Sequence, residues 1–439
     1  GLWLRVCYPP PPHNALSSPV AEPYARLLAV PHHFTLGLEQ LQRGVVSQGD
    51  RTRLRNFVRK LAHGEPVNVG FLGASITVGQ GSTYPRERGY APLVYKYLHN
   101  VSDAIGYNNA GVGAVTNGYF AMCMSNHLKP DNDLIVVDMC VNDMIQLYDA
   151  SHSAHESILR QLLAQPRRPA VVEAMFPRLF AYYRGRPLYS SSHADQIGVL
   201  AQYYNLPWVA TRSAVWPDFL KNATGYALDD LVIQDHTHPT DRGHAIMADL
   251  LIHLLRQEAR ALGTSEPWTE FDDRLLARET TEPMLEATPR EGTPGICRVG
   301  EAARQLALPA NSTGFEWVDE GKPGNPKWGW VGRKAGDELL LQFSTLVESA
   351  ASLADMAKMH FMYLRSYDQM GIANVSCVQG CTCPHLKIDA LKNIHASETM
   401  VVSLPISQSP SCVLSVQILE RPKDPSLTKF KVVGIGISL

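Results

Sequence analysis

The sequence predicts an α/β domain with a parallel sheet, followed by a β-sandwich. Three short runs, at 67–73, 134–139 and 170–175, are almost continuously apolar, as in strands buried on both faces of a parallel sheet. Segments with apolar residues at helical spacing lie between them, and strands that alternate with helices imply a doubly wound sheet. Beyond residue 296, short apolar runs are separated by turn residues, which is typical of a sandwich.

The individual elements follow from the apolar spacing and from the residues that begin and end each segment. The last helix of the α/β part is the clearest, because Thr240 suits an N-cap, leucines recur through 250–255 and Gly263 follows as a stop. Further helices are expected at 54–61, 91–99, 157–163 and 195–204. The strands expected in the sandwich are 339–343, 360–364, 401–404, 413–419 and 430–437.

These patterns divide the chain into four parts. Residues 1–64 are expected to hold a Pro-rich arm (8–23) and helices, and residues 65–263 the α/β domain. Residues 264–295 are rich in Pro, Thr and Glu with little periodicity, which indicates a linker or wrapping segment. Residues 296–439 form the predicted β-sandwich.

Composition and charge exclude several classes of function. The chain has 439 residues, 45% of them hydrophobic and 19% charged, as in a soluble protein of about two domains. A net charge of −2 creates no field that would attract nucleic acid or an anionic membrane. No apolar run is long enough to span a bilayer. We therefore expect a soluble protein with no nucleic-acid partner and no membrane span.

Cysteines and glycosylation sequons favour a secreted or cell-surface protein. Cys377, Cys381, Cys383 and Cys412 gather near the C-terminus and predict disulfides formed in an oxidising compartment. A zinc site is the alternative, which the shortage of well-spaced histidines disfavours. The chain opens at Gly1 rather than Met, which suits a processed form. The sequons that would carry glycans are at Asn100, Asn222, Asn311 and Asn374.

The first segment with chemical meaning is the Gly-Ala-Ser-Ile-Thr run at 73–77. A serine on a strand-to-helix turn exposes its hydroxyl at the carboxyl edge of the sheet, and its own N–H can face a bound oxyanion. Ser75 stands at that point. Alone, so short a motif would indicate no more than a turn serine.

The second segment places an Asp three residues before a His, in a loop ahead of the last helix. Asp235 can bond Nδ1 of His238 and leave Nε2 directed toward a nucleophile. A metal site formed with His236 and His244 is the alternative. We disfavour it, and expect no metal, because two of these imidazoles would face opposite sides of an extended loop.

Two further segments supply groups that can donate hydrogen bonds. Asn142 follows the strand at 134–139, and its amide can donate to a developing oxyanion. Small residues at 108–114 predict a turn whose backbone N–H groups can closely approach a substrate. All four segments fall at the carboxyl ends of strands or in adjoining loops, where ligands bind to open α/β sheets.

Together the four segments resemble the SGNH (GDSL-like) hydrolase family. The segments similar to the family's blocks are, in chain order, 73–76, 109–114, 141–143 and 235–238. The resemblance covers roughly residues 65–262. It implies a three-layer, flavodoxin-like fold and ester hydrolysis without any cofactor. It also implies Ser75 as nucleophile, His238 as its general base and Asp235 as the residue that orients the imidazole.

The oxyanion hole implied by the resemblance departs from the family pattern. Its donors would be the N–H of Ser75, the N–H of Ala114 and the amide of Asn142. The family has a glycine where this chain has Ala114, and Gly113 is the alternative register. It also has a glycine where this chain has Cys140. Because a backbone N–H serves from any of these residues, the changes affect the expected substrate more than the chemistry.

The expected substrate rests on the resemblance. Similar secreted SGNH proteins often remove acetyl groups from polysaccharides, which favours an acetylated polysaccharide. Trp317, Trp328 and Trp330 could stack on sugar rings, although aromatics of a sandwich more often fill its core. A lipid or small-molecule ester is the runner-up.

A function without catalysis is the rival interpretation. The Pro-rich arm, the β-domain and the altered glycines permit a glycoprotein with partners in an extracellular matrix or on a cell surface. The joint presence of Ser75, Asn142, Asp235 and His238 favours the enzyme, because a protein without activity has little chemical reason to keep them together.

Overall fold

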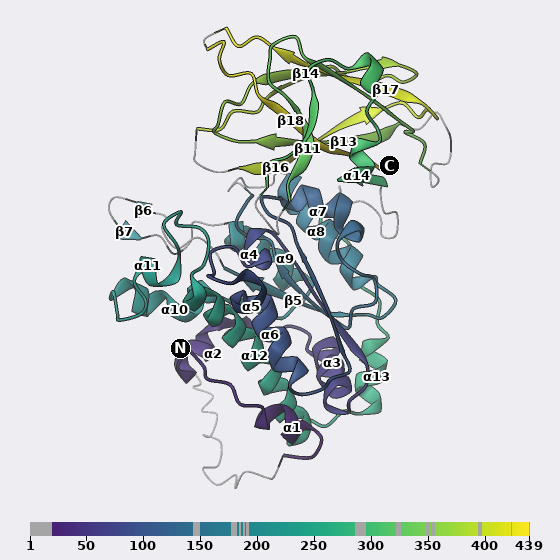
Figure 1. Cartoon of the computed structure of the whole chain (residues 1–439). Helices are drawn as coiled ribbons and strands as arrows, with labels where there is room; N and C mark the ends of the chain where they lie inside the picture. The colour runs from purple at the N-terminus through teal and green to yellow at the C-terminus, as the bar shows by residue number, and fades with distance from the viewer. Residues whose placement is uncertain are drawn as a thin grey trace, which may run out of the picture.

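The computed structural model describes residues 20–143, 150–176, 182–183, 186–187, 189, 193–285, 296–321, 326–347, 352, 356–393, 397–422 and 424–438. The expected arm at 8–23 lies outside this set up to residue 19. Two domains are stacked in Figure 1, an α/β domain in purple to teal and an all-β domain in green to yellow. This is the predicted fold class.

The α/β domain is built on a six-stranded sheet with the order β1–β8–β5–β4–β2–β3. All its neighbouring strands are parallel except β1, which is antiparallel to β8. Three predicted strands correspond to β2, β4 and β5. The strands are β1 (Val45–Ser47), β2 (Val67–Gly73), β3 (Ile105–Gly111), β4 (Leu134–Asp138), β5 (Ala170–Met175) and β8 (Trp208–Ala210).

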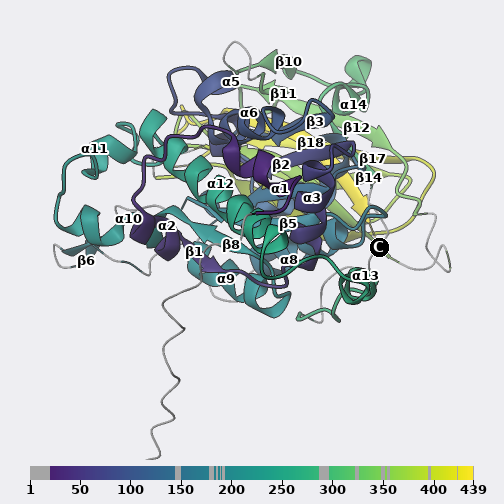
Figure 2. The same cartoon turned by 90° about the horizontal axis from the view of Figure 1, so that it is seen from below.

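Helices cover both faces of this sheet, with α3, α6 and α12 on one side and α8 and α9 on the other (Figure 2). Phe71 and Leu72 of β2 belong to different apolar clusters, one on each face, which explains why the strand is apolar throughout. The helices are α1 (Tyr24–Ala29), α2 (Leu38–Gly44), α3 (Thr52–Ala62), α4 (Ser75–Val78), α5 (Pro85–Arg88), α6 (Tyr90–His99), α7 (Asn117–Cys123), α8 (Ala150–Leu163), α9 (His193–Tyr203), α10 (Thr211–Leu220), α11 (Leu228–Leu231), α12 (Asp241–Gly263) and α13 (Glu270–Leu276).

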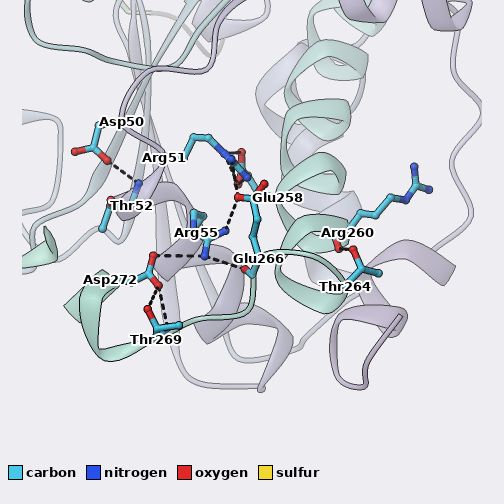
Figure 3. Close-up of polar contacts among 10 residues, drawn as sticks. All are labelled: Asp50, Arg51, Thr52, Arg55, Glu258, Arg260, Thr264, Glu266, Thr269 and Asp272. Atoms are coloured by element: carbon cyan, nitrogen blue, oxygen red, sulfur yellow. Dashed lines mark hydrogen bonds and ion pairs between the residues drawn. The ribbon is translucent and has the colours of Figure 1, made fainter. Parts of the chain in front are cut away.

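The segment after α12 packs against the α/β domain as far as it is described. Arg51, just before α3, bonds Glu258 of α12 at 2.8 Å and Glu266 at 2.8 Å. Arg55 reaches the backbone carbonyl of Glu266 at 2.9 Å and Asp272 of α13 at 3.4 Å (Figure 3). The part of the expected linker that contains α13 is thus held on α3 by charged hydrogen bonds.

The β-domain is a sandwich of two antiparallel sheets. One has the order β10–β11–β18–β13–β16, with β9 also paired to β18, and the other is β12–β17–β14–β15. The short helix α14 (Glu301–Arg304) follows β9. The strands are β9 (Ile296–Val299), β10 (Glu316–Asp319), β11 (Trp328–Gly332), β12 (Glu338–Phe343), β13 (Ala357–Arg365), β14 (Ile372–Gln379), β15 (Leu386–Asp389), β16 (Glu398–Ile406), β17 (Cys412–Leu419) and β18 (Phe430–Ser438).

Disulfides lie within the β-domain and between the two domains. The predicted C-terminal disulfides are confirmed, as Cys377–Cys383 and Cys381–Cys412, so these sulfurs do not form the alternative zinc site. A third disulfide, Cys123–Cys297, joins the end of α7 to β9 and so links the domains. Within the described part of the chain, no helix is long and apolar enough to cross a membrane.

Candidate active site

Ser75 begins the short helix α4, with one residue between it and the end of strand β2. The residue is 5% exposed, and its Oγ lies 2.7 Å from Nε2 of His238. As the first residue of a helix, Ser75 has an N–H that no intrahelical carbonyl can accept. The strand-to-helix turn places Ser75 at the carboxyl edge of the sheet, as the sequence predicts.

His238 is held by a tight loop that precedes α12. The loop is closed by an isolated bridge between Val232 and Pro239. Asp235 Oδ1 accepts the N–H groups of Thr237 and His238, both at 2.9 Å. Its Oδ2 lies 2.5 Å from His238 Nδ1. Burial alone would raise the pKa of Asp235, but these hydrogen bonds outweigh it and hold the pKa below its usual value.

A second loop, after α4, packs against the histidine loop. Gly81 has φ +97°, and a Cβ there would lie 2.2 Å from the carbonyl oxygen of Pro239, so only glycine permits this approach. Asp241, the first residue of α12, accepts the N–H of Thr83 at 2.8 Å and bonds Arg88 at 2.9 Å. The two loops therefore fix the His238 side chain relative to Ser75.

His244 supports this arrangement from inside the domain. Its Nε2 lies 3.1 Å from the carbonyl oxygen of Gln80, and its Nδ1 accepts the N–H of Tyr90 at 3.3 Å. Burial lowers the pKa of His244 to about 4, so the ring is neutral at physiological pH. One ring nitrogen thus contacts the loop after α4, and the other contacts the first residue of α6.

The loop after β3 carries Gly113 and Ala114. It is tied to the end of β2 by a 3.0 Å bond from the N–H of Val112 to the carbonyl of Gly73, two residues before Ser75. Ala114, not Gly113, has the left-handed conformation, with φ +66°. For a residue with a Cβ this conformation costs roughly 1–2 kcal/mol.

Two of the predicted oxyanion donors, Ala114 and Asn142, lie at this loop. The side-chain amide of Asn142 donates one N–H to the carbonyl of Val115 at 2.7 Å, and its second N–H remains for another acceptor. Among the residues that the structure describes, the N–H of Ala114 has no acceptor. The turn expected at 108–114 begins later, because 108–111 complete strand β3.

Buried polar groups behind the site were not predicted. Asn117, at the start of α7, bonds Asp143 at 2.9 Å and His155 at 2.8 Å. His155 in turn lies 2.9 Å from Glu173, and both side chains are fully buried. These contacts join α7, α8 and β5 to the segment that carries Asn142. No local pattern indicates them, since the partners are far apart in sequence.

Asp138 is a second unpredicted group. It ends β4 and is fully buried. Burial raises the pKa of Asp138 to about 8, and the negative charge of Glu173 adds to the shift, against opposing hydrogen bonds. Asp138 is therefore largely protonated at neutral pH.

The four expected glycosylation sites differ in their surroundings. Asn100, Asn222 and Asn311 are exposed. Asn374 is half-buried in β14, which pairs with strands on both sides. Glycan attachment is therefore more readily accommodated at the first three.

Residues 71–246 match the family model of the GDSL-like lipase/acylhydrolase family. A solved two-domain esterase active on acetylated mannans covers 91% of this chain and 98% of its own, with 20% identity and a TM-score of 0.61. The same esterase co-crystallised with mannopentaose has the same identity and coverage and a TM-score of 0.64. No curated protein shows a significant match to this chain.

At this identity the structural likeness shows the fold, while the family match covers the segments that hold Ser75, Asn142 and His238. The family match agrees with the predicted hydrolase domain, and the structural likeness agrees with a hydrolase domain followed by a β-domain. Residues 71–246 therefore form a hydrolase domain of the GDSL-like (SGNH) type, which supports a serine ester hydrolase, and a C-terminal β-domain follows it.

Proposed function

We propose that this chain is a secreted esterase that removes acetyl groups from a polysaccharide, with Ser75, His238 and Asp235 as its catalytic triad. The proposed triad rests on one observation. Oγ of Ser75 lies 2.7 Å from His238 Nε2, and the opposite ring nitrogen lies 2.5 Å from a carboxylate oxygen of Asp235. This order of contacts is the one that general-base activation of a serine requires.

The reaction follows from these contacts. Asp235 accepts the Nδ1 proton of His238, so Nε2 has a lone pair and takes the proton from Ser75 as Oγ attacks the ester carbonyl. His238 then gives this proton to the departing sugar oxygen, and an acetyl group stays on Ser75. Water attacks the acetyl-enzyme with His238 again as base, and acetate and free Ser75 result.

The negative charge on the carbonyl oxygen needs donors in both steps. The N–H of Ser75, the N–H of Ala114 and the second amide N–H of Asn142 would supply them. Each such donor contributes roughly 3–4 kcal/mol to transition-state stabilisation. The left-handed backbone of Ala114 supports its N–H, rather than that of Gly113, as the donor from this loop.

A cavity between the domains supports a sugar substrate. It has a volume of about 530 Å³, and its walls include Val112–Val115 of the hydrolase domain and Trp328 of the β-domain. Trp328 is 45% exposed, and Trp317 stacks parallel to it with ring centroids 6.0 Å apart. Trp330 is half-buried against the sandwich core. Aromatic faces beside polar groups are suited to pyranose rings, and the two-domain esterase of the same fold acts on acetylated mannans.

Secretion is supported by the disulfides and by the exposed sequons. Disulfides form and persist mainly in oxidising compartments. Asn100, Asn222 and Asn311 are exposed, as glycan acceptors must be. Expression in a eukaryotic secretory host should give protein in the medium whose mass falls on treatment with an N-glycosidase.

A fluorophosphonate probe tests the triad. Wild type and Ser265→Ala, an exposed serine in the turn after α12, should be labelled, and Ser75→Ala should not. The wild type should then release acetate from acetylated mannan, and Ser75→Ala should not. A folded wild type that neither reacts with the probe nor hydrolyses a simple acetate ester would instead favour the non-catalytic extracellular glycoprotein.

A further inference from the structure

The β-domain contacts the proposed oxyanion loop directly, through edge strand β16. The N–H of Thr399 donates to the carbonyl of Ala114 at 2.6 Å. Val115 and Thr399 form an isolated parallel bridge. The hydroxyl of Thr116 donates to the carbonyl of Thr399 at 3.2 Å. Both backbone groups of one β16 residue are therefore used by the loop of the other domain.

The position of β16 permits these contacts. It is the last strand of its sheet, paired with β13 along one side. An edge strand has backbone N–H and C=O groups that no neighbouring strand uses. In Figure 1 β16 lies at the border between the domains, close to α7, which follows the loop in sequence.

The bonded carbonyl belongs to the residue with the unusual backbone. Ala114 has φ +66°, a conformation that glycine adopts freely and alanine does not. On its hydrolase side the loop is held by Asn142, which bonds Val115. On its other side the contact comes from Thr399. A hydrogen bond to the Ala114 carbonyl fixes the peptide that follows and so opposes relaxation of the left-handed turn.

We infer that Thr399 is a positioning residue for the reaction, whose backbone N–H holds Ala114 in the left-handed conformation that directs the Ala114 N–H at the oxyanion. The β-domain is then a part of the catalytic unit. It also accounts for an alanine where the family has glycine, because the second domain supplies the restraint that glycine makes unnecessary. The inference rests on the proposed function.

Thr399→Pro removes the backbone N–H of residue 399. It does not disturb the side of β16 that pairs with β13. Proline is tolerated at edge positions whose N–H points away from the sheet, and β16 already contains Pro405. With p-nitrophenyl acetate, which is too small to depend on the sugar cavity, we expect kcat to fall at least 10-fold. KM should stay within about twofold of wild type, because the donor acts on the oxyanion and not on the bound ester.

The decisive measurement is the same substitution in an Ala114→Gly background. Glycine adopts the left-handed conformation without help, so Thr399→Pro should there lower kcat by less than about threefold. An equal loss in both backgrounds would show that Thr399 does not act through Ala114. An unchanged kcat in Thr399→Pro alone would also overturn the inference.

Thr116→Val keeps the test valid if the proline variant does not fold. It removes the hydroxyl that bonds the Thr399 carbonyl, with nearly the same volume. A fall in kcat that Ala114→Gly abolishes supports the inference, and wild-type kcat contradicts it. Ser75→Ala distinguishes a failure of the proposed function from a failure of the positioning role. If that variant retains activity, the proposed function fails, whereas an inactive Ser75→Ala with a fully active Thr399→Pro refutes only the positioning role.

Discussion

One carboxylate holds His238 by its side chain and its backbone together. Asp235 Oδ2 lies 2.5 Å from the imidazole Nδ1, while Oδ1 accepts the His238 N–H at 2.9 Å. These bonds lower the pKa of Asp235 despite its partial burial, so the carboxylate is charged at neutral pH. A charged acceptor at Nδ1 places the proton there and leaves Nε2 free to accept from Ser75.

The first prediction concerns this tautomer. Asp235→Asn keeps an oxygen for the two backbone N–H groups but presents an N–H₂ group to Nδ1, which favours a proton on Nε2. We expect kcat for a simple acetate ester to fall by about 10⁴-fold, the effect known for this change in a serine protease triad. Steady-state kinetics at pH 7–8 measures it, with Asp229→Asn, on the exposed side of α11, as the matched control. Activity within a few fold of the control would remove Asp235 from the triad.

Asn142 gives the second prediction. Asn142→Ala removes one proposed oxyanion donor and the bond to the Val115 carbonyl. We expect kcat to fall by about 10²–10³-fold while turnover remains measurable, because two backbone donors are kept. The fraction of enzyme titrated by a fluorophosphonate after long incubation should stay near that of wild type, since Ser75 and His238 are intact. A complete loss of this titration would indicate a misfolded site.

The candidate catalytic residues could be proposed from the sequence because their signals are local. Ser75 follows an apolar strand, and Asp235 and His238 are three residues apart in one loop before a well-capped helix, where Thr240 accepts the N–H of Gly243 at 3.2 Å. The apolar runs at β2, β4 and β5 likewise identify strands buried on both faces. Strand β3 lacked such a run, because four of its central residues are only half-buried.

The groups that the sequence did not indicate act across long separations. Thr399 meets Ala114 from another domain, and His155 meets Glu173 from a different element. No spacing rule relates such partners. The left-handed conformation of Ala114 also has no sequence signal, because glycine is the residue that adopts it freely.

A third prediction concerns the pH dependence of stability at Asp138. Its pKa in the folded protein is about 8, above the unfolded value of about 3.9. Below pH 4 the carboxyl is protonated in both states, so it does not change the free energy of unfolding. Between pH 4 and 8 the unfolded chain ionises while the folded protein stays protonated, so stability falls as the pH rises.

Asp138→Asn removes this titration and keeps a neutral side chain of the same shape. The free energy of unfolding of the variant, relative to wild type, should therefore increase from pH 4 to pH 8 and level off above it. Denaturant unfolding at several pH values measures the difference. The contributions of other titrating groups to the pH dependence cancel between the two proteins. Parallel stability curves for wild type and variant would contradict the raised pKa.

The last prediction concerns the ion pairs that hold α12 and α13 on α3. The side chain of Glu258 is 1% exposed and is bonded by Arg51 through two nitrogens. Arg51→Met would leave this carboxylate buried without its partner, which typically costs about 3–5 kcal/mol. Arg26→Met is the control, because Arg26 and Glu22 are 73% and 71% exposed and such a pair contributes about 1 kcal/mol or less. Thermal unfolding should show a Tm lower by several degrees for Arg51→Met and nearly unchanged for Arg26→Met.

The double variant Arg51→Met with Glu258→Leu should recover part of the loss, since no unpaired charge remains. Equal Tm values for the two single arginine variants would mean that the buried network contributes no more than a surface pair.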